Sequence, residues 1–148
     1  LKNDQYTILK DRKKLIVFEE KSVSNDIFYI KSKDDVLNIP IFMNISEVEK
    51  EEFNSDKSTI FVNSNLLKWP LVLRRKQTGD YFQPFGMNGI KKVSKFFKDE
   101  KLSKIQKDNT WILENGDGKI IWIVGLRADD RFKIINKNQK NYKITLNQ

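Results

Sequence analysis

The 148-residue chain contains no cysteine and no histidine. The lack of cysteine excludes a disulfide framework and a thiolate metal site, and it fits a reducing compartment. The lack of histidine excludes Ser-His-Asp and Cys-His nucleophilic systems, His-ligated metals and an imidazole general base. Many common enzyme classes are therefore excluded before any motif is considered.

Long apolar segments are also lacking. No apolar run approaches the roughly 20 residues that a membrane-spanning helix needs, and no signal peptide is visible. We therefore expect a cytoplasmic protein. The chain opens at Leu1 rather than at Met, as expected for a piece cut from a longer protein.

The composition is that of a folded protein with an excess of positive charge. Hydrophobic residues make up 39% of the chain and aromatic residues 11%, enough for a packed core in one domain or two small ones. The net charge is +8 and is unevenly placed. Residues 71–104 hold nine Lys and Arg against three Asp and Glu, whereas residues 1–70 hold eleven against twelve. Clustered positive charge attracts polyanions, although a basic surface kept for solubility is the alternative.

The first half of the chain has the pattern of a β-rich region without a chemical motif. A polar turn at residues 11–14 separates two apolar runs, which predicts a hairpin. Pro40 limits residues 39–45 to an edge strand or the end of a loop. The acidic segment 47–52 is either an exposed helical turn or a loop. Strands are predicted at residues 6–9, 15–18, 27–30 and 59–62.

The second half combines strands with one amphipathic helix. A turn at Gly79-Asp80 and a loop over residues 83–89 precede a helical period that starts at Ile90. Strands are predicted at residues 71–74, 120–124, 131–135 and 142–146. The mixture predicts an α+β fold.

The predicted helix has an apolar arc and a basic arc. Its apolar residues are Ile90, Val93, Phe96 and Phe97, and its basic residues are Lys91, Lys92, Lys95 and Lys98. Exposed helices usually mix charges through i,i+4 pairs, and like charges repel one another. A face of one sign is favourable when an anion such as phosphate neutralises it, although lysine-rich helices that bind nothing are common.

Two acidic corners echo one another in the sequence. Gly79-Asp80-Tyr81-Phe82 follows Arg75, and Asp129-Asp130-Arg131-Phe132 follows Arg127. The favoured interpretation is structural: each carboxylate caps a turn and pairs with a nearby arginine. A metal site formed by Asp80, Asp129 and Asp130 is the alternative. The aromatic residues Tyr81, Phe82 and Phe85 are candidates for stacking on bases, although at least two are expected in the core.

A longer string of motifs carries a family resemblance. LVLR at 71–74, GDYFQPFGMNG at 79–89, KKVSKFFKDEK at 91–101, IWIVGLR at 121–127 and DRFKI at 130–134 follow one another in order. Together they resemble the C-terminal domain of tRNA(Ile)-lysidine synthetase over residues 69–146. The family often has Arg where Tyr81 stands, and Ser-Asp or Ser-Glu where Asp129-Asp130 stands. Residues 1–68 match only loosely the region between the family's catalytic and terminal domains.

The resemblance implies a fold and an activity. The family uses ATP to join lysine to an anticodon cytidine of tRNA(Ile). That chemistry, with ATP and Mg²⁺, belongs to an N-terminal PP-loop domain whose SGGxDS-type loop does not occur in this chain. This portion is therefore expected to bind and position tRNA, beside the upstream catalytic domain, at the acceptor-stem end. The implied fold is a β-rich intermediate region over 1–68, followed over 69–148 by a small mixed α/β sandwich resembling a domain of the phenylalanyl-tRNA synthetase β-subunit.

The predicted site consists of cations without a catalytic or metal-ligating residue. The arginines of the set have an alternative role as structural partners of Asp80 and Asp130. A protein-interaction module that docks on its own upstream domains or on another chain is the alternative function, and a free-standing enzyme with carboxylates in a cleft is the third. The expected phosphate contacts are Arg74, Lys91, Lys92, Lys95, Lys98, Arg127 and Arg131.

Overall fold

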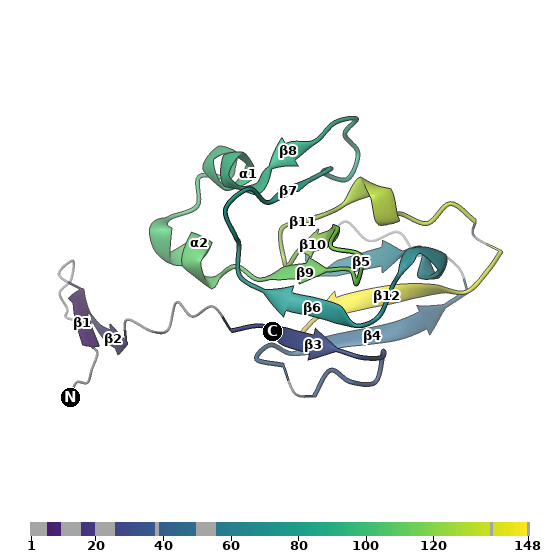
Figure 1. Cartoon of the computed structure of the whole chain (residues 1–148), viewed down its shortest axis with the longest axis horizontal. Helices are drawn as coiled ribbons and strands as arrows, with labels where there is room; N and C mark the ends of the chain where they lie inside the picture. The colour runs from purple at the N-terminus through teal and green to yellow at the C-terminus, as the bar shows by residue number, and fades with distance from the viewer. Residues whose placement is uncertain are drawn as a thin grey trace.

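The computed structural model describes residues 6–9, 16–19, 26–37, 39–49, 56–136 and 138–147. It is rich in antiparallel strands, with short helices after the middle of the chain (Figure 1). The strands are β1 Tyr6–Leu9, β2 Ile16–Glu19, β3 Phe28–Ile30, β4 Met43–Val48, β5 Thr59–Val62, β6 Leu71–Arg74, β7 Tyr81–Phe82, β8 Lys91–Lys92, β9 Ile112–Glu114, β10 Ile120–Ile123, β11 Arg127–Ala128 and β12 Asn141–Leu146. The helices are α1 Val93–Asp99, α2 Lys104–Asn109 and the 3₁₀ turns η2 Ser64–Leu66 and η3 Asp130–Phe132.

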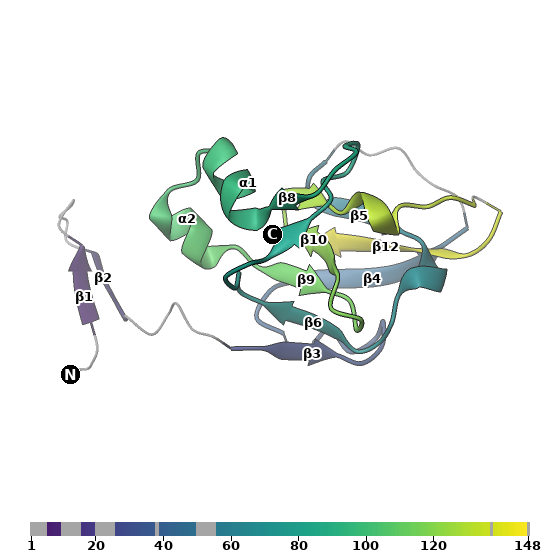
Figure 2. The same ribbon diagram turned by 45° about the horizontal axis from the view of Figure 1, so that its top comes forward.

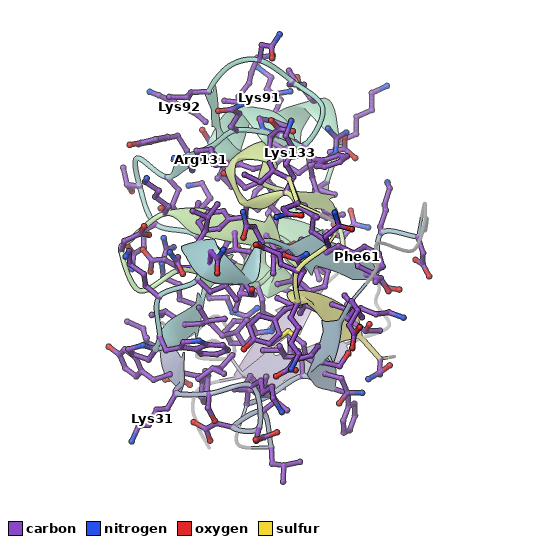
Figure 3. All side chains as sticks on the ribbon, turned by 90° about the vertical axis from the view of Figure 1, so that its right-hand side faces the viewer. Lys31, Phe61, Lys91, Lys92, Arg131 and Lys133 are labelled. Carbon is purple, nitrogen blue, oxygen red and sulfur yellow. The ribbon has the colours of Figure 1, made fainter. Side chains whose placement is uncertain are left out.

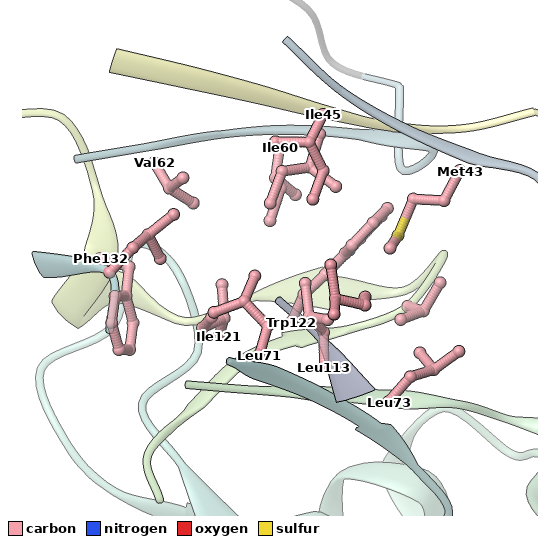
Figure 4. Packing of buried hydrophobic residues seen from close by; sticks show 14 residues of the cluster. Met43, Ile45, Ile60, Val62, Leu71, Leu73, Leu113, Ile121, Trp122 and Phe132 are labelled. Carbon is pink, nitrogen blue, oxygen red and sulfur yellow. The ribbon is translucent and has the colours of Figure 1, made fainter. Parts of the chain in front are cut away.

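Two antiparallel sheets form the body of the molecule (Figures 1 and 2). One has five strands in the order β11-β10-β9-β6-β3, and the other has three in the order β4-β12-β5. The main core lies between them. In Figure 4, Val62, Ile60 and Met43 from one sheet face Leu71, Leu113 and Trp122 from the other. Burial of such apolar side chains is the dominant favourable term in folding.

A bulge lets β10 serve both faces of the five-stranded sheet. The register between β10 and β9 shifts between Ile120 and Trp122. Two consecutive residues, Ile121 and Trp122, therefore join the core between the sheets, while Ile120 and Ile123 join a second cluster. The second cluster is covered by α1 and the β7–β8 ribbon, which form a third layer.

Most predicted strands are confirmed. β1 and β2 pair antiparallel as the expected hairpin, whose turn at 11–14 lies outside the described residues. β10 is buried at every position, and β5, β6 and β12 match their predicted ranges closely. The turn at 79–80 is also present. The predicted α+β class and sandwich are confirmed.

Two predictions of local structure were wrong. The segment 131–135 is not a strand: Asp129 accepts a hydrogen bond from the Arg131 backbone N–H, and this cap starts η3 instead. The helix begins at Val93 rather than at Ile90, because Lys91 and Lys92 pair with β7 as a strand. The segment 39–45 was predicted correctly as the boundary between a loop and an edge strand, since the edge strand β4 begins at Met43. The short elements α2 and β9 were not predicted.

The strand pairing crosses residue 68. β3 pairs with β6, and both β4 and β5 pair with β12, so these three strands share sheets and a core with the second half of the chain. The division into two domains, residues 1–68 and 69–148, stays a prediction. The acidic segment 47–52 forms the end of β4 at residues 47–48, and its remainder from residue 50 lies outside the described residues.

Candidate nucleic-acid interface

The β7–β8 ribbon presents one aromatic side chain outward and one inward. Tyr81 lies directly opposite Lys92, and Phe82 lies opposite Lys91. Since side chains alternate along a strand, Phe82 is fully buried while Tyr81 and Lys92 are exposed on the outer side. Phe82 packs edge to face on Phe96 with ring centroids 5.2 Å apart. The ribbon is thereby fixed on α1.

The helix α1 is anchored as the sequence predicted, with one exception. Val93, Phe96 and Phe97 are buried in the second cluster. Ile90, in contrast, is 67% exposed, because it precedes the β8 strand and does not lie on the helix. Three apolar side chains therefore hold α1 against the sheet, and Lys95 and Lys98 project into solvent.

A single carboxylate binds two of the predicted lysines. Asp99 accepts Lys91 Nζ at 2.6 Å and Lys95 Nζ at 2.9 Å. Hydrogen bonds from Lys91 and then from Lys95 lower the pKa of Asp99 to about 2. Lys91 is also the less exposed of the two, with its ammonium 5.8 Å from the Phe96 ring centre. The single-sign face predicted from the sequence is therefore partly neutralised by the chain itself.

Other cations remain available to a partner. Lys92 and Lys98 are exposed and make no ion pair within the described residues. Lys95 keeps most of its side chain in water despite its pair with Asp99. We call Lys92, Lys95, Lys98 and Arg131 the basic face. Figure 3 shows Lys91, Lys92, Arg131 and Lys133 at one end of the view, with Lys31 at the opposite end.

Arg74 has a structural role in this arrangement. Its side chain is only 5% exposed, and its guanidinium binds both oxygens of Asp80, at 2.9 and 3.0 Å, and Glu114 at 3.0 Å. Burial alone lowers the pKa of Arg74, but the hydrogen bonds to Asp80 and Glu114 outweigh it and the net shift is upward. The structural alternative is correct for Arg74, which is too enclosed to meet an external phosphate.

Arg131 and Arg127 differ from Arg74. Arg131 binds the carboxylate of buried Asp129 through Nε at 3.0 Å and Nη2 at 2.8 Å, which raises the pKa of Arg131, and its side chain stays 26% exposed. Its partner is Asp129 and not Asp130, which instead receives Lys133 at 3.4 Å. The Arg127 guanidinium lies 5.8 Å from the Phe96 ring centre, is half-buried and has no ion pair among the described residues.

The loop after β7 is fastened to the second acidic corner. The Asp130 N–H donates to the Gln83 carbonyl at 2.7 Å, and the Phe85 N–H donates to the Ala128 carbonyl at 2.9 Å. In return, Asp129 accepts the Gln83 N–H and Asp130 accepts the Gly86 N–H, both at 3.0 Å. The loop that follows the first corner therefore contacts the second corner. Carboxylates of both corners accept backbone N–H groups as expected, since Asp80 also accepts the Gln77 N–H.

Sequence reasoning missed Lys133 and the effect of Asp99. The i,i+4 spacing of Lys95 and Asp99 is visible in the sequence. The second ion pair, between Asp99 and Lys91, depends on the β8 strand, which was predicted as part of the helix.

The described residues contain no group of three or more side chains suited to a metal ion, and Asp80 and Asp129 each bind an arginine. The described residues include no helix long and apolar enough to span a membrane.

Comparison with known proteins identifies the family of the chain. The family model described as the TilS substrate C-terminal domain matches residues 71–145, just over half of the chain. The chain belongs to this family. A tRNA(Ile)-lysidine synthase from Parabacteroides distasonis is 36% identical over 132 residues, covering 87% of this chain and 30% of that protein. The enzyme of the same name from Caldanaerobacter subterraneus is 33% identical over 98 residues, covering 66% of this chain and 20% of that protein.

One solved structure shows the same fold for this TilS-family chain. The crystal structure of a TilS C-terminal domain aligns with a TM-score of 0.67 at 21% identity, covering 82% of this chain and 96% of that chain. An N-terminal fragment of the Pyrococcus horikoshii phenylalanyl-tRNA synthetase β-subunit aligns with a TM-score of 0.49 at 9% identity, covering 70% of this chain and 28% of that chain. The chain spans about a third or less of the length of the curated relatives that it matches.

Proposed function

We propose that this chain is the tRNA-binding C-terminal part of a ligase that uses ATP and lysine to convert an anticodon cytidine of tRNA(Ile) to lysidine. In this proposal the chain positions the tRNA, and an upstream domain of the same protein carries the catalytic residues. Membership of the TilS substrate C-terminal domain family supports the substrate class. The exposed lysines of the basic face are the observation that carries the mode of binding.

The basic face suits the backbone of duplex RNA better than a base-reading pocket would. Duplex RNA is recognised mainly through its shape, its phosphates and its 2′-hydroxyls. Lys92 and Lys98 have no ion pair within the described residues, so no internal contact must break before they meet phosphate. Arg131 is held in place by Asp129, and its side chain is 26% exposed, which leaves it accessible to a phosphate oxygen. Lys91 and Arg127 are secondary contacts, because each packs near Phe96.

Charge reversal of the basic face tests the proposal. We expect the triple change Lys92→Glu, Lys95→Glu and Lys98→Glu to lower the affinity for a tRNA(Ile) transcript by at least about 100-fold at low salt. Each phosphate contact that is lost also lowers the slope of log affinity against log salt by about one. Filter binding or fluorescence anisotropy over a range of salt concentrations measures both quantities.

The matched control changes the same charge elsewhere. Lys31, Lys57 and Lys68 are exposed and lie outside the β7–β8–α1 segment. Their triple change to Glu should leave most of the affinity and most of the salt slope, because only long-range attraction is altered. Equal losses in the two triple variants, with unchanged thermal stability, would contradict the proposed face.

A protein-docking role is the second candidate. Leu37 is 90% exposed, and a shallow groove lined by apolar side chains runs past Ile41, Trp111 and Leu126. Exposed apolar surface of this kind is typical of protein-interaction sites. Binding of an upstream domain there would change little with salt, whereas phosphate binding would fall steeply, so the salt series distinguishes the two functions.

A further inference from the structure

We propose that the exposed ring of Tyr81 is a stacking platform for an unpaired base at the end of an RNA duplex. The surface would then bind a junction between duplex and single strand rather than duplex alone. This inference rests on the proposed RNA contact of the basic face and adds a second kind of contact to it.

Tyr81 exposes its aromatic side chain on the outer side of the β7–β8 ribbon. Tyr81 is 51% exposed, whereas its neighbour Phe82 is fully buried. The alternation along β7 sends the Tyr81 ring to the outer side of the ribbon, where Lys92 lies directly across the strand pair. Tyr81 is not part of either apolar cluster, and about half of its surface is accessible to a partner.

Two cations are held close to the segment that carries this ring. Lys92 is the cross-strand neighbour of Tyr81. Arg131 is bound by Asp129, which also accepts the backbone N–H of Gln83, two residues after Tyr81. The bidentate pair with Asp129 fixes the Arg131 guanidinium. A base stacked on Tyr81 would thus have its flanking phosphates beside Lys92 and Arg131.

The backbone that follows Tyr81 is already ordered. Gln83 and Phe85 exchange backbone hydrogen bonds with residues 128 and 130, at 2.7 and 2.9 Å. Phe85, also exposed, therefore extends from a loop that is held at both of its sides. Rings on a preorganised backbone lose little conformational entropy on binding, which favours recognition.

An unpaired base is the ligand that fits this combination. Bases inside a duplex stack on their neighbours and offer no free face, whereas bases at single-stranded ends stack on aromatic side chains. Stacking tolerates any base because each has a π-face, and flanking cations neutralise the backbone. A ring beside a phosphate-binding face is therefore placed for the point where a duplex ends.

RNA hairpins with one common stem test the inference. One hairpin is blunt, and two others carry a short overhang on the 3′ or the 5′ strand, with 2-aminopurine as the first unpaired base. We expect the full chain to bind at least one overhang hairpin about ten-fold more tightly than the blunt one, and to quench its 2-aminopurine fluorescence. Tyr81→Leu should remove both effects and leave blunt binding unchanged, whereas Tyr81→Phe should retain them.

The controls separate this inference from the proposed function. Ile105→Ala removes a side chain that is equally exposed, at 51%, but lies on α2, and it should change neither affinity. Blunt binding by Tyr81→Leu also reports that the variant is folded. If both overhangs bind no better than the blunt stem while the basic-face variant weakens all three, the stacking inference is overturned and the proposed function stands. If no hairpin and no tRNA binds the chain, both are overturned.

Discussion

Asp99 is the side chain that most limits the basic face, because it binds Lys91 and Lys95 at once. The ordinary pKa of an Asp carboxyl is 3.8, and in this fold the pKa of Asp99 is lowered to about 2. A depressed carboxyl pKa stabilises the folded state above pH 3.8, and this stabilisation is lost as pH falls toward 2.

We therefore expect Asp99→Asn to lower Tm slightly at pH 5 and above, and the difference from the unaltered chain to vanish near pH 2. Thermal unfolding followed by circular dichroism between pH 2 and 6 measures this. Glu100→Gln is the matched control, since Glu100 is exposed and has no ion pair within the described residues. A Tm difference for Asp99→Asn that persists at pH 2 would show that the ion pairs are not its cause.

Arg74 contributes to stability rather than to binding. Its removal would leave Asp80, 11% exposed, and Glu114 without the cation between them. We expect Arg74→Met to reduce the free energy of unfolding by about 3–5 kcal/mol, the usual cost of breaking a buried ion pair from one side. Lys92→Met, on an exposed cation of the basic face, should change it by no more than about 0.5 kcal/mol. Urea denaturation distinguishes the two, and similar losses would contradict the assigned roles.

The sequence could identify the cations but not their environment. It offered two roles for Arg74 because burial depends on β9, which supplies Glu114 from 40 residues away. It paired the second corner's arginine with Asp130, whereas Asp129 lies deeper and takes Arg131. Both choices are made by tertiary contacts, so local pattern alone cannot resolve them.

Among the elements, α1 shows what periodicity can predict. The arc of Val93, Phe96 and Phe97 was correct because the 3.6-residue period holds within the helix. The prediction that Ile90 belongs to this apolar arc was wrong, because residues 91–92 follow the two-residue period of a strand paired with β7. The strand predicted at residues 131–135 was wrong for a related reason. The Asp129 cap favours a 3₁₀ turn there, although the sequence alternates as in a strand.

The position at which α1 begins can be tested by mutation. We expect Phe96→Ala to reduce the free energy of unfolding by about 3–5 kcal/mol, because the ring is buried between Phe82 and the five-stranded sheet. Ile90→Ala should change it by no more than about 0.5 kcal/mol, because Ile90 lies outside the helix and in solvent. A large loss of unfolding free energy for Ile90→Ala would instead support the longer helix, starting at Ile90, that the sequence pattern predicted.

For the whole molecule, composition predicted a basic second half but overstated the charge available to a partner. Of the basic residues in 71–104, Arg74 is in buried ion pairs and Arg75 stacks on Trp111 at 3.6 Å. Lys91, Lys92, Lys95 and Lys98 belong to the third layer, which packs on one face of the five-stranded sheet, while the core between the two sheets lies on its other face. The order of the strands, in which β12 separates β4 from β5, has no signal in the sequence because it depends on contacts between distant segments.

Lysine footprinting tests the central claim, that RNA meets this chain on the basic face. The full chain is acetylated with a limited amount of reagent, with and without a tRNA(Ile) transcript, and the modified sites are quantified by mass spectrometry. We predict that the transcript protects Lys92, Lys95 and Lys98 and leaves the reactivity of Lys31, Lys57 and Lys68 unchanged. Protection of the second set, or equal protection of both sets, would contradict the account.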